Sequence, residues 1–282
     1  MMRVARRPQG GCALGSGRLI MAIAIAAIAL IGYFSSRSFN DITGETQHIS
    51  ITKEQEVALG LQAAPQMAQE FGGLSPDQAG QSAVDSVCRQ LITTTDVAKS
   101  DYPFECHLLA DQETVNAFAL PGGQIFITQA LYDRLETEGQ LAGVLGHEVG
   151  HVVGRHGAEH IAKQQLTEGL TGAVVVAASD PNDPQHSQYA AQLAILVGQL
   201  VNMKYGRDDE LESDRLGVRF MTQAGYDPNS LVRVMEILEA ASQGPRPPEF
   251  FSTHPNPGNR IEKIKQDIAT EYPDGLPAGL KP

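Results

Sequence analysis

The sequence contains no tryptophan, and aromatic residues make up only 6% of its 282 residues. Proteins that bind single-stranded nucleic acid stack bases on aromatic side chains, so this composition disfavours that class. Basic residues are also scarce: 21 lysines and arginines stand against 33 aspartates and glutamates, which gives a formal net charge of −12. A protein that wraps nucleic acid needs a basic surface. We therefore predict that this chain does not bind nucleic acid.

Cysteine is rare, with three residues in the whole chain. Cys88 and Cys106 either pair in an oxidising compartment or remain buried thiols, and the sequence does not decide between these alternatives. The 28 glycines and 16 prolines are too few for a low-complexity chain. With 42% hydrophobic residues, the chain suits one domain of ordinary size or two small ones.

Acidic residues are absent from the first 40 positions, which hold five arginines. An uncharged run follows at 19–34, and a basic segment before an apolar run is typical of a secretory signal or membrane anchor. Because no convincing cleavage site follows, we predict a transmembrane signal anchor at 19–36 after a basic cytoplasmic tip at 1–18. The chain would then be a single-pass protein of the bacterial inner membrane, facing the periplasm. A cleaved signal and a mitochondrial inner-membrane location are the alternatives.

The remainder is predicted to be an α+β domain at 51–274, reached by a polar linker at 37–50 and followed by a tail at 275–282. Helical patterns begin near Thr52 and Ser75 and recur at 129–136, 138–166, 188–205, 208–224, 228–241 and 258–271. Three short β-type runs lie between them, FECHLLA, TVNAFAL and QIFIT, and a Pro-Gly-Gly turn joins the last two. We therefore expect a mostly helical domain with one small sheet.

Two apolar segments, 166–178 and 190–201, are shorter than a membrane span and are predicted to be buried or interfacial helices. The polar loop between them, at 179–188, follows the long central helix directly. It could therefore cover whatever that helix carries.

The sequence His147-Glu148-Val149-Gly150-His151 is an HExxH motif within a helical pattern. At about 100° per residue, the two histidines lie about 40° apart on one helix face, one turn apart in height. Two imidazole nitrogens in this arrangement suit one tetrahedral Zn²⁺. Glu148 lies beside them, where it can take a proton from a zinc-bound water. We predict one zinc ion per chain.

A catalytic zinc ion needs a third protein ligand, and two acids downstream have the required spacing. Glu210 and Asp214 are four residues apart on one helix face, whereas Glu212 points about 160° away from Asp214. One of the paired carboxylates can ligate zinc while the other accepts the second ring N–H of a ligand histidine. The sequence does not decide which carboxylate has which role.

A second histidine pair, His156 and His160, fits the inverted HxxEH zinc motif. Counted along one continuous helix, His156 lies about 180° around from His147, so only one of the two pairs can face the interior. The residues flanking the second pair are polar. We therefore interpret His156 and His160 as members of a solvated helix face.

Four segments, VNAFALPGGQIFIT, HEVGH, ELESDRLG and THPNPGNRI, occur in the order found in the HtpX- and CAAX-prenyl-protease-type zinc metallopeptidases, which the chain resembles over roughly 50–272. The family pattern ExxAD falls on Glu210 through Asp214, with Ser213 in place of alanine. This resemblance implies a gluzincin-type fold, with Glu210 as the third zinc ligand and Asp214 as the carboxylate behind a ligand histidine.

The resemblance also extends to the C-terminal motif. The family's histidine falls on His254, and Arg260 follows it as a supporting residue. The resemblance implies that His254 contacts the metal or the oxyanion. It would either block the open coordination position at rest or stabilise the transition state.

In zinc peptidases of the fold that this chain resembles, an edge strand near the metal binds an extended peptide through its backbone. The segment TVNAFAL is the candidate for this strand, so Asn116 and Ala117 within it are our predicted substrate contacts. We predict a membrane-anchored zinc metalloendopeptidase that acts on proteins and peptides, with misfolded envelope proteins as substrates in quality control and the lipid bilayer as a partner. One alternative is a metal-binding, chaperone-like module that holds misfolded proteins without cleaving them, and another is an exopeptidase. The glutamate of HExxH favours an enzyme, because a binding module does not need it.

Overall fold

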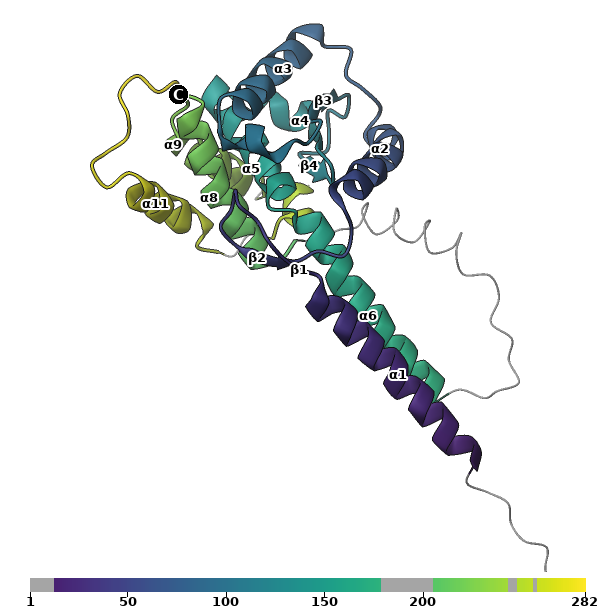
Figure 1. Cartoon of the computed structure of the whole chain (residues 1–282). Coiled ribbons are helices and arrows are strands. Elements are labelled where there is room, and N and C mark those ends of the chain that lie inside the picture. Colours follow the sequence, from purple (N-terminus) through teal and green to yellow (C-terminus); the bar gives the residue numbers. More distant parts are fainter. Residues whose placement is uncertain (1–12, 179–204, 243–247, 256–257) are drawn as a thin grey trace, which may run out of the picture.

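Helix α5 (Glu138–Val153) lies at the centre of the fold (Figure 1). The computed structural model describes residues 13–178, 205–242, 248–255 and 258–282. Every residue of α5 after Glu138 is buried, because α3 (Gln78–Thr93), α8 (Arg207–Gln223) and α9 (Asn229–Ser242) pack around it. A helix surrounded in this way can be apolar on all sides and carry its few polar residues for a purpose other than solubility.

A three-stranded sheet packs beside α5, with the strand order β3-β5-β4. Strand β3 (Glu105–Leu109) runs parallel to β5 (Gln124–Thr128), and β4 (Ala117–Leu120) pairs antiparallel with β5 and forms an edge. The turn between β4 and β5 needs glycine at Gly122, where φ is 85° and a Cβ atom would overlap the backbone of Val57 in α2 (Lys53–Glu70). The small sheet and the hairpin predicted from the sequence are confirmed, whereas the described residues also contain a second, two-stranded sheet that was not predicted.

Other helices of the body are short or lie at its surface. They are the 3₁₀ helix η1 (Asp96–Ser100), α4 (Gln129–Tyr132), α10 (Phe250–Thr253) and α11 (Arg260–Glu271). The patterns at 208–224 and 228–241 match α8 and α9 to within one residue at each end. The mostly helical α+β class is therefore confirmed.

The long helix predicted at 138–166 is instead two helices. Helix α5 ends at Val153, and α6 (His156–Ala178) begins after Arg155, whose φ of 55° is left-handed. A non-glycine residue in this conformation interrupts an α-helix, and a hydrogen bond from Arg155 Nη2 to the carbonyl of Ile51 helps to hold it there. The break changes the direction of every side chain that follows.

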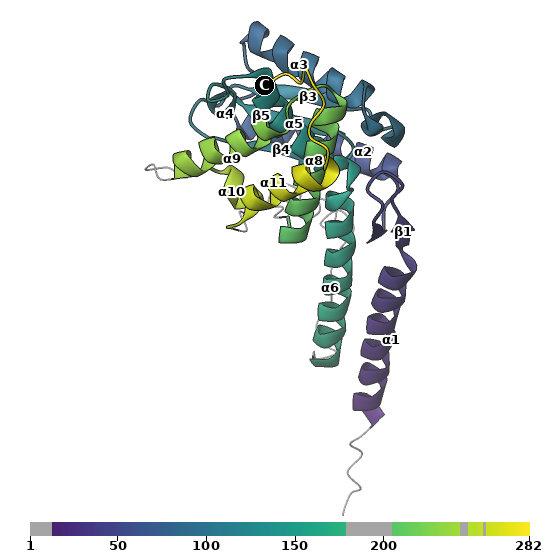
Figure 2. The same cartoon turned by 90° about the vertical axis from the view of Figure 1, so that its left-hand side faces the viewer.

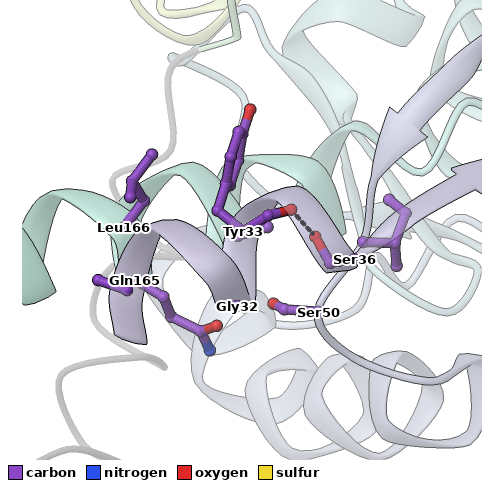
Figure 3. Close-up of a pocket in the computed structure, with 9 residues that line it drawn as sticks. Gly32, Tyr33, Ser36, Ser50, Gln165 and Leu166 are labelled. Atoms are coloured by element: carbon purple, nitrogen blue, oxygen red, sulfur yellow. Dashed lines mark hydrogen bonds between the residues drawn. The ribbon is translucent and has the colours of Figure 1, made fainter. Parts of the chain in front are cut away.

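Helices α1 (Ala13–Ser35) and α6 pack side by side and extend away from the body (Figures 1 and 2). A cavity of about 400 Å³ lies between them, beside Tyr33, Ser36, Gln165 and Leu166 (Figure 3). Helix α1 exposes large apolar side chains over more than half of their surface: Leu19, Ile20, Met21, Ile23, Ile28, Ile31 and Phe34.

The predicted transmembrane helix at 19–36 is not supported. Within the described residues, the structure has no helix that is both long and apolar enough to cross a membrane. The uncharged run of α1, at 19–34, is shorter than the roughly 20 apolar residues that a span needs.

The segment predicted as a linker, 37–50, contains a β-hairpin. Strands β1 (Arg37–Phe39) and β2 (Thr46–His48) pair antiparallel. Asn40 donates a hydrogen bond to the carbonyl of Val153 at 2.8 Å, and Gln47 donates to the carbonyl of Gly154. The last carbonyls of a helix lack hydrogen-bond partners within the helix. The hairpin therefore supplies donors to the carbonyls at the C-terminal end of α5.

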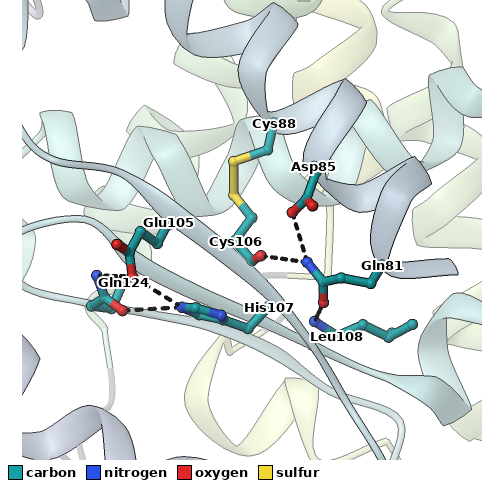
Figure 4. The surroundings of a disulfide bond; sticks show 8 residues. All are labelled: Gln81, Asp85, Cys88, Glu105, Cys106, His107, Leu108 and Gln124. Carbon is teal, nitrogen blue, oxygen red and sulfur yellow. Dashed lines mark hydrogen bonds and ion pairs between the residues drawn. A yellow bond between two sulfur atoms is a disulfide. The ribbon is translucent and has the colours of Figure 1, made fainter. Parts of the chain in front are cut away.

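Cys88 of α3 and Cys106 of β3 form a disulfide, which decides between the two alternatives left by the sequence (Figure 4). Gln81 of α3 accepts a hydrogen bond from the amide of Leu108 at 2.7 Å and donates one to the carbonyl of Cys106 at 2.9 Å. The disulfide and the glutamine together attach α3 to β3.

Some predictions concern parts of the chain that are not described. The basic tip up to residue 12, the 179–188 loop and the helix expected at 188–205, except for Tyr205, lie outside the described residues. The predicted apolar segment at 166–178 forms the C-terminal half of α6.

Candidate metal centre

Helices α5 and α8 approach closely because small residues line both sides of their crossing. Gly146 faces Gly217, and a Cβ atom on Gly150 would lie 3.0 Å from the carbonyl oxygen of Ser213. Larger side chains would hold the two helices apart. The close crossing places the acids of α8 directly against the histidines of α5.

Four buried side chains place metal-binding atoms within 4.8 Å of one another: His147, His151, Glu210 and His254. The Nε2 atoms of His147 and His151 are 3.0 Å apart. Glu210 Oε1 lies 3.4 Å from His151 Nε2 and 3.0 Å from His254 Nδ1. In a tetrahedral zinc site with bonds of 2.0–2.1 Å, neighbouring ligand atoms lie about 3.3 Å apart. The cluster therefore has ligand types and spacings that fit a zinc ion.

Glu148 lies beside this cluster and is fully buried. Neither of its carboxylate oxygens accepts a hydrogen bond from any described residue, and Oε1 is 3.6 Å from His254 Nε2. Burial raises the pKa of Glu148. Because buried polar groups in native proteins have partners, these oxygens call for a partner other than the described residues.

Asp214 and Arg260 both contact His147, and Arg260 Nη2 lies 3.1 Å from its Nδ1 and 3.2 Å from its Nε2. Asp214 Oδ1 lies 3.0 Å from His147 Nδ1, and Arg260 donates to both oxygens of Asp214 at 2.6 and 2.8 Å. Burial and the Arg260 charge lower the pKa of His147, but Asp214 and Glu210 outweigh them and raise it to about 9. Although burial raises the pKa of Asp214, the Arg260 charge and the His147 contact bring it below its ordinary value.

The charges in the centre are unbalanced in a way that suits a divalent cation. Glu148, Glu210 and Asp214 are fully buried, and Arg260 Nη1 lies 3.0 Å from Glu210 Oε2. When the three acids are ionised and the histidines are neutral, as metal binding requires, the acids exceed this guanidinium by two negative charges. A buried charge is stable only when it is paired, and a dication would supply the missing positive charge.

Two residues near the metal centre were not found from the sequence. The ring of Tyr205 stacks on His151 with a centroid distance of 3.8 Å, and its hydroxyl donates to the carbonyl of Ala119 at 3.4 Å. His156 is 1% exposed, and its Nδ1 lies 2.9 Å from His151 Nδ1. Tyr205 lies at the end of the predicted 188–205 helix and belongs to no motif, but Gly154 is a helix-end signal that could have placed the break before His156.

The interpretation of His156 as solvated is therefore wrong. It relied on a continuous helix through 138–166, along which His156 would lie opposite His147. Because α5 ends at Val153, the left-handed turn at Arg155 brings the His156 ring back beside His151. His160, the other histidine of that pair, is only partly buried.

Asn116 and Ala117, the predicted substrate contacts, are buried and are not part of the metal-binding cluster. Ala117 begins the edge strand β4, and Asn116 precedes it. At this edge the carbonyl of Val115 accepts a hydrogen bond from the amide of Phe250 at 3.2 Å, and Ala119 accepts one from Tyr205. The backbone groups that could bind a peptide are thus partly occupied by α10 and Tyr205.

Comparisons with known proteins find a peptidase family and relatives that are named as proteases. Residues 78–268 match the model of peptidase family M48. The beta-barrel assembly-enhancing protease of Escherichia coli (strain K12) is 29% identical over 63% of this chain and 37% of its own length. The mitochondrial metalloendopeptidase OMA1 of Schizosaccharomyces pombe is 30% identical over 83% of this chain and 67% of its own length, and the human mitochondrial OMA1 is 28% identical over 85% and 47%.

The chain spans only 37% of the length of the E. coli relative. The match at 78–268 includes α5 and α8, which carry three of the four clustered side chains. The resemblance to a zinc metallopeptidase family is confirmed, and with it the expectation of a metalloendopeptidase at the level of the family. The chain belongs to peptidase family M48.

Proposed function

We propose that this chain is a zinc-dependent metalloendopeptidase that hydrolyses peptide bonds within proteins. The observation that carries the proposal is the cluster of four buried metal-binding side chains beside Glu148, whose carboxylate has no hydrogen-bond partner among the described residues. The relatives support it, because their names are those of proteases and metalloendopeptidases.

In this proposal His147, His151 and Glu210 hold the metal. When bound, zinc supplies a Lewis acid that polarises the peptide carbonyl and makes a water molecule more acidic. Glu148 takes a proton from the attacking water and passes it to the leaving amine. Its raised pKa suits this role, because a base that must return its proton works best when its pKa lies nearer to neutral pH.

Asp214 and Arg260 act on His147 rather than on the substrate. Asp214 accepts the Nδ1 proton of His147, so that Nε2 remains free to bind metal. Arg260 fixes the Asp214 carboxylate through two hydrogen bonds. Asp214 and Arg260 therefore hold the His147 ring in a single orientation and tautomer.

His254 closes the fourth coordination position at rest in this proposal, because its Nδ1 lies 3.4 Å from His147 Nε2 and 3.0 Å from Glu210 Oε1. A catalytic site needs that position for water or substrate, so α10 has to move before cleavage. The same movement would release the Val115 carbonyl. An extended substrate could then add to β4 near Asn116 and Ala117.

Digestion of an unfolded protein tests the proposal directly. The purified chain should cleave reduced, unfolded casein at internal bonds, lose this activity when a chelator removes the metal, and regain it when zinc is added. The rival candidate, a metal-binding module that holds unfolded chains, predicts binding of casein without any fragments. Absence of fragments under zinc-replete conditions, with casein bound, would favour the rival.

We also infer that the enzyme attaches to a lipid bilayer through α1 and acts in protein quality control in an oxidising compartment, the bacterial periplasm. The exposed apolar side chains of α1 support attachment. The Cys88–Cys106 disulfide supports the compartment, because disulfides persist where thiols are not kept reduced. The name of the E. coli relative, which refers to β-barrel assembly, supports misfolded envelope proteins as substrates.

Vesicle flotation tests the attachment. The wild-type chain should float with vesicles of phosphatidylethanolamine and phosphatidylglycerol, whereas a variant with Ile20, Ile23 and Ile31 changed to glutamine should remain below. The matched control is Leu74→Gln, which alters a side chain that is 63% exposed on the body. Equal flotation of the triple variant and the wild type would contradict attachment through α1.

A further inference from the structure

His156 contacts a metal-binding histidine but is not itself a member of the metal-binding cluster. Its Nδ1 lies 2.9 Å from His151 Nδ1, on the side of the His151 ring opposite the cluster. Its Nε2 lies 3.3 Å from Glu212 Oε2. His156 thus bridges a ligand histidine and a carboxylate that the proposed mechanism does not use.

We propose that Glu212 and His156 form a hydrogen-bonded relay that fixes His151 in the tautomer whose Nε2 binds the metal. The inference rests on the proposed zinc site but goes beyond it, because it assigns positioning roles to two further residues. It also gives a separate role to each of Glu210, Glu212 and Asp214 on α8. Glu210 faces the cluster, Asp214 orients His147 directly, and Glu212 reaches His151 through His156.

The direction of the hydrogen bonds follows from the number of protons that the rings can share. The Glu212 carboxylate can only accept, so a neutral His156 donates from Nε2 and leaves a lone pair on Nδ1. Two ring nitrogens 2.9 Å apart share one proton, so His151 donates from its Nδ1. His151 then has no proton on Nε2, the atom that lies 3.0 Å from His147 Nε2. The reverse direction would place a proton on His151 Nε2 and prevent metal binding.

The hydroxyl of Ser213 agrees with this assignment. Its Oγ lies 3.3 Å from His156 Nδ1, where the hydroxyl and the His151 N–H can share the one Nδ1 lone pair in a three-centre hydrogen bond. Ser213 is adjacent to Glu212 on α8 and is fully buried. Both polar neighbours of His156 on this helix are therefore compatible with a neutral imidazole that accepts at Nδ1 and donates at Nε2.

The backbone around His156 is shaped for this contact. A Cβ atom on Gly154 would lie 2.5 Å from His156 Nε2, so only glycine leaves room for the ring. Arg155 adopts the left-handed conformation that returns the chain toward His151, and a buried ion pair with Glu56 of α2 holds it there. A histidine that merely filled space would not require these two unusual neighbours.

The zinc affinity of variants at His156 distinguishes a positioning role of this residue from a packing role. We would measure the zinc dissociation constant of the purified full chain by competition with a chromophoric chelator. His156→Leu keeps most of the side-chain volume but removes the acceptor, and it should weaken zinc binding by about 10- to 100-fold, as is typical when the partner of a ligand histidine is lost. His156→Asn restores an acceptor near the position of Nδ1 and should recover most of the affinity. His160→Leu, the matched control on the same helix, should leave zinc binding unchanged.

The outcomes that overturn the relay are specific. The relay is wrong if His156→Leu binds zinc as tightly as the wild type, or if His156→Asn loses as much affinity as His156→Leu. Should His156→Leu fail to fold, Glu212→Leu provides the second test, and wild-type zinc affinity in that variant would equally overturn the proposal. If instead the wild-type chain binds no zinc and cleaves no protein, the proposed function itself fails.

Discussion

Arg260 is the cation on which the buried acids of the site depend. Its side chain is fully buried, donates two hydrogen bonds to Asp214 and lies 3.0 Å from Glu210 Oε2. The acids raise the pKa of Arg260 more than burial lowers it, so it stays charged. Removing it would leave carboxylates in the interior without a counter-ion, which is costly in a medium that cannot solvate them.

We therefore expect Arg260→Met to destabilise the metal-free chain by about 3–5 kcal/mol, the usual cost of breaking a buried ion pair from one side. Urea unfolding in the presence of a chelator measures this change. Arg233→Met is the matched control, because Arg233 is 68% exposed and pairs with Glu236 at the surface. A similar midpoint for both variants would contradict the account of Arg260 as the cation that balances the site.

Residues of the site could be predicted where they lie close to one another in the sequence. His147, Glu148 and His151 lie within one helical turn, so their spacing alone places the two histidines on one face. Tyr205 could not be predicted, because its contact with His151 depends on how the chain before α8 crosses α5. The position of His156 was predicted wrongly, because the left-handed backbone conformation of Arg155 depends on tertiary contacts. Helical periodicity does not encode such contacts.

At the scale of elements, α8 and α9 were predicted because their apolar residues recur with helical spacing. The helix predicted to begin near Thr52 is α2, where Thr52 forms a capping box with Gln55. The hairpin β1–β2 could not be predicted, because it is three residues long on each strand and depends on carbonyls that α5 leaves free. The predicted elements are therefore those stabilised by their own sequence, and the missed one is stabilised by its neighbour.

Helix α10 controls access to the site in this account. We expect His254→Ala to raise the rate of cleavage of a short unstructured peptide and to weaken zinc binding, because it opens the fourth coordination position and removes a ligand. A peptide assay and a zinc titration on the same preparation measure both effects. If His254 stabilises the oxyanion instead, the rate should fall by about 10²- to 10³-fold while zinc affinity stays the same.

At the scale of the whole molecule, the Cys88–Cys106 disulfide connects α3 to the sheet that packs on α5. It joins residues 18 positions apart. A loop of this length restricts the unfolded chain, which stabilises the folded state by about 3 kcal/mol. The disulfide therefore contributes to the stability of the body without taking part in the metal centre.

We expect the double variant Cys88→Ser, Cys106→Ser to lose about 2–4 kcal/mol of unfolding free energy, measured by urea unfolding without reductant. Reductant should destabilise the wild type by a similar amount and leave the double variant unaffected. Equal stability of the wild type with and without reductant would contradict the disulfide's contribution.

The most direct test of the account is a paired measurement on Glu148→Gln. Glu148 lies beside the four clustered side chains and is not one of them, so the variant should bind zinc as the wild type does. Because glutamine cannot take a proton from water, cleavage of unfolded casein should fall by about 10²- to 10⁴-fold, the range expected for loss of a general base. Full zinc content with this loss of cleavage is the predicted result. Full zinc content with wild-type cleavage would contradict the central claim that Glu148 is the base of a zinc metallopeptidase.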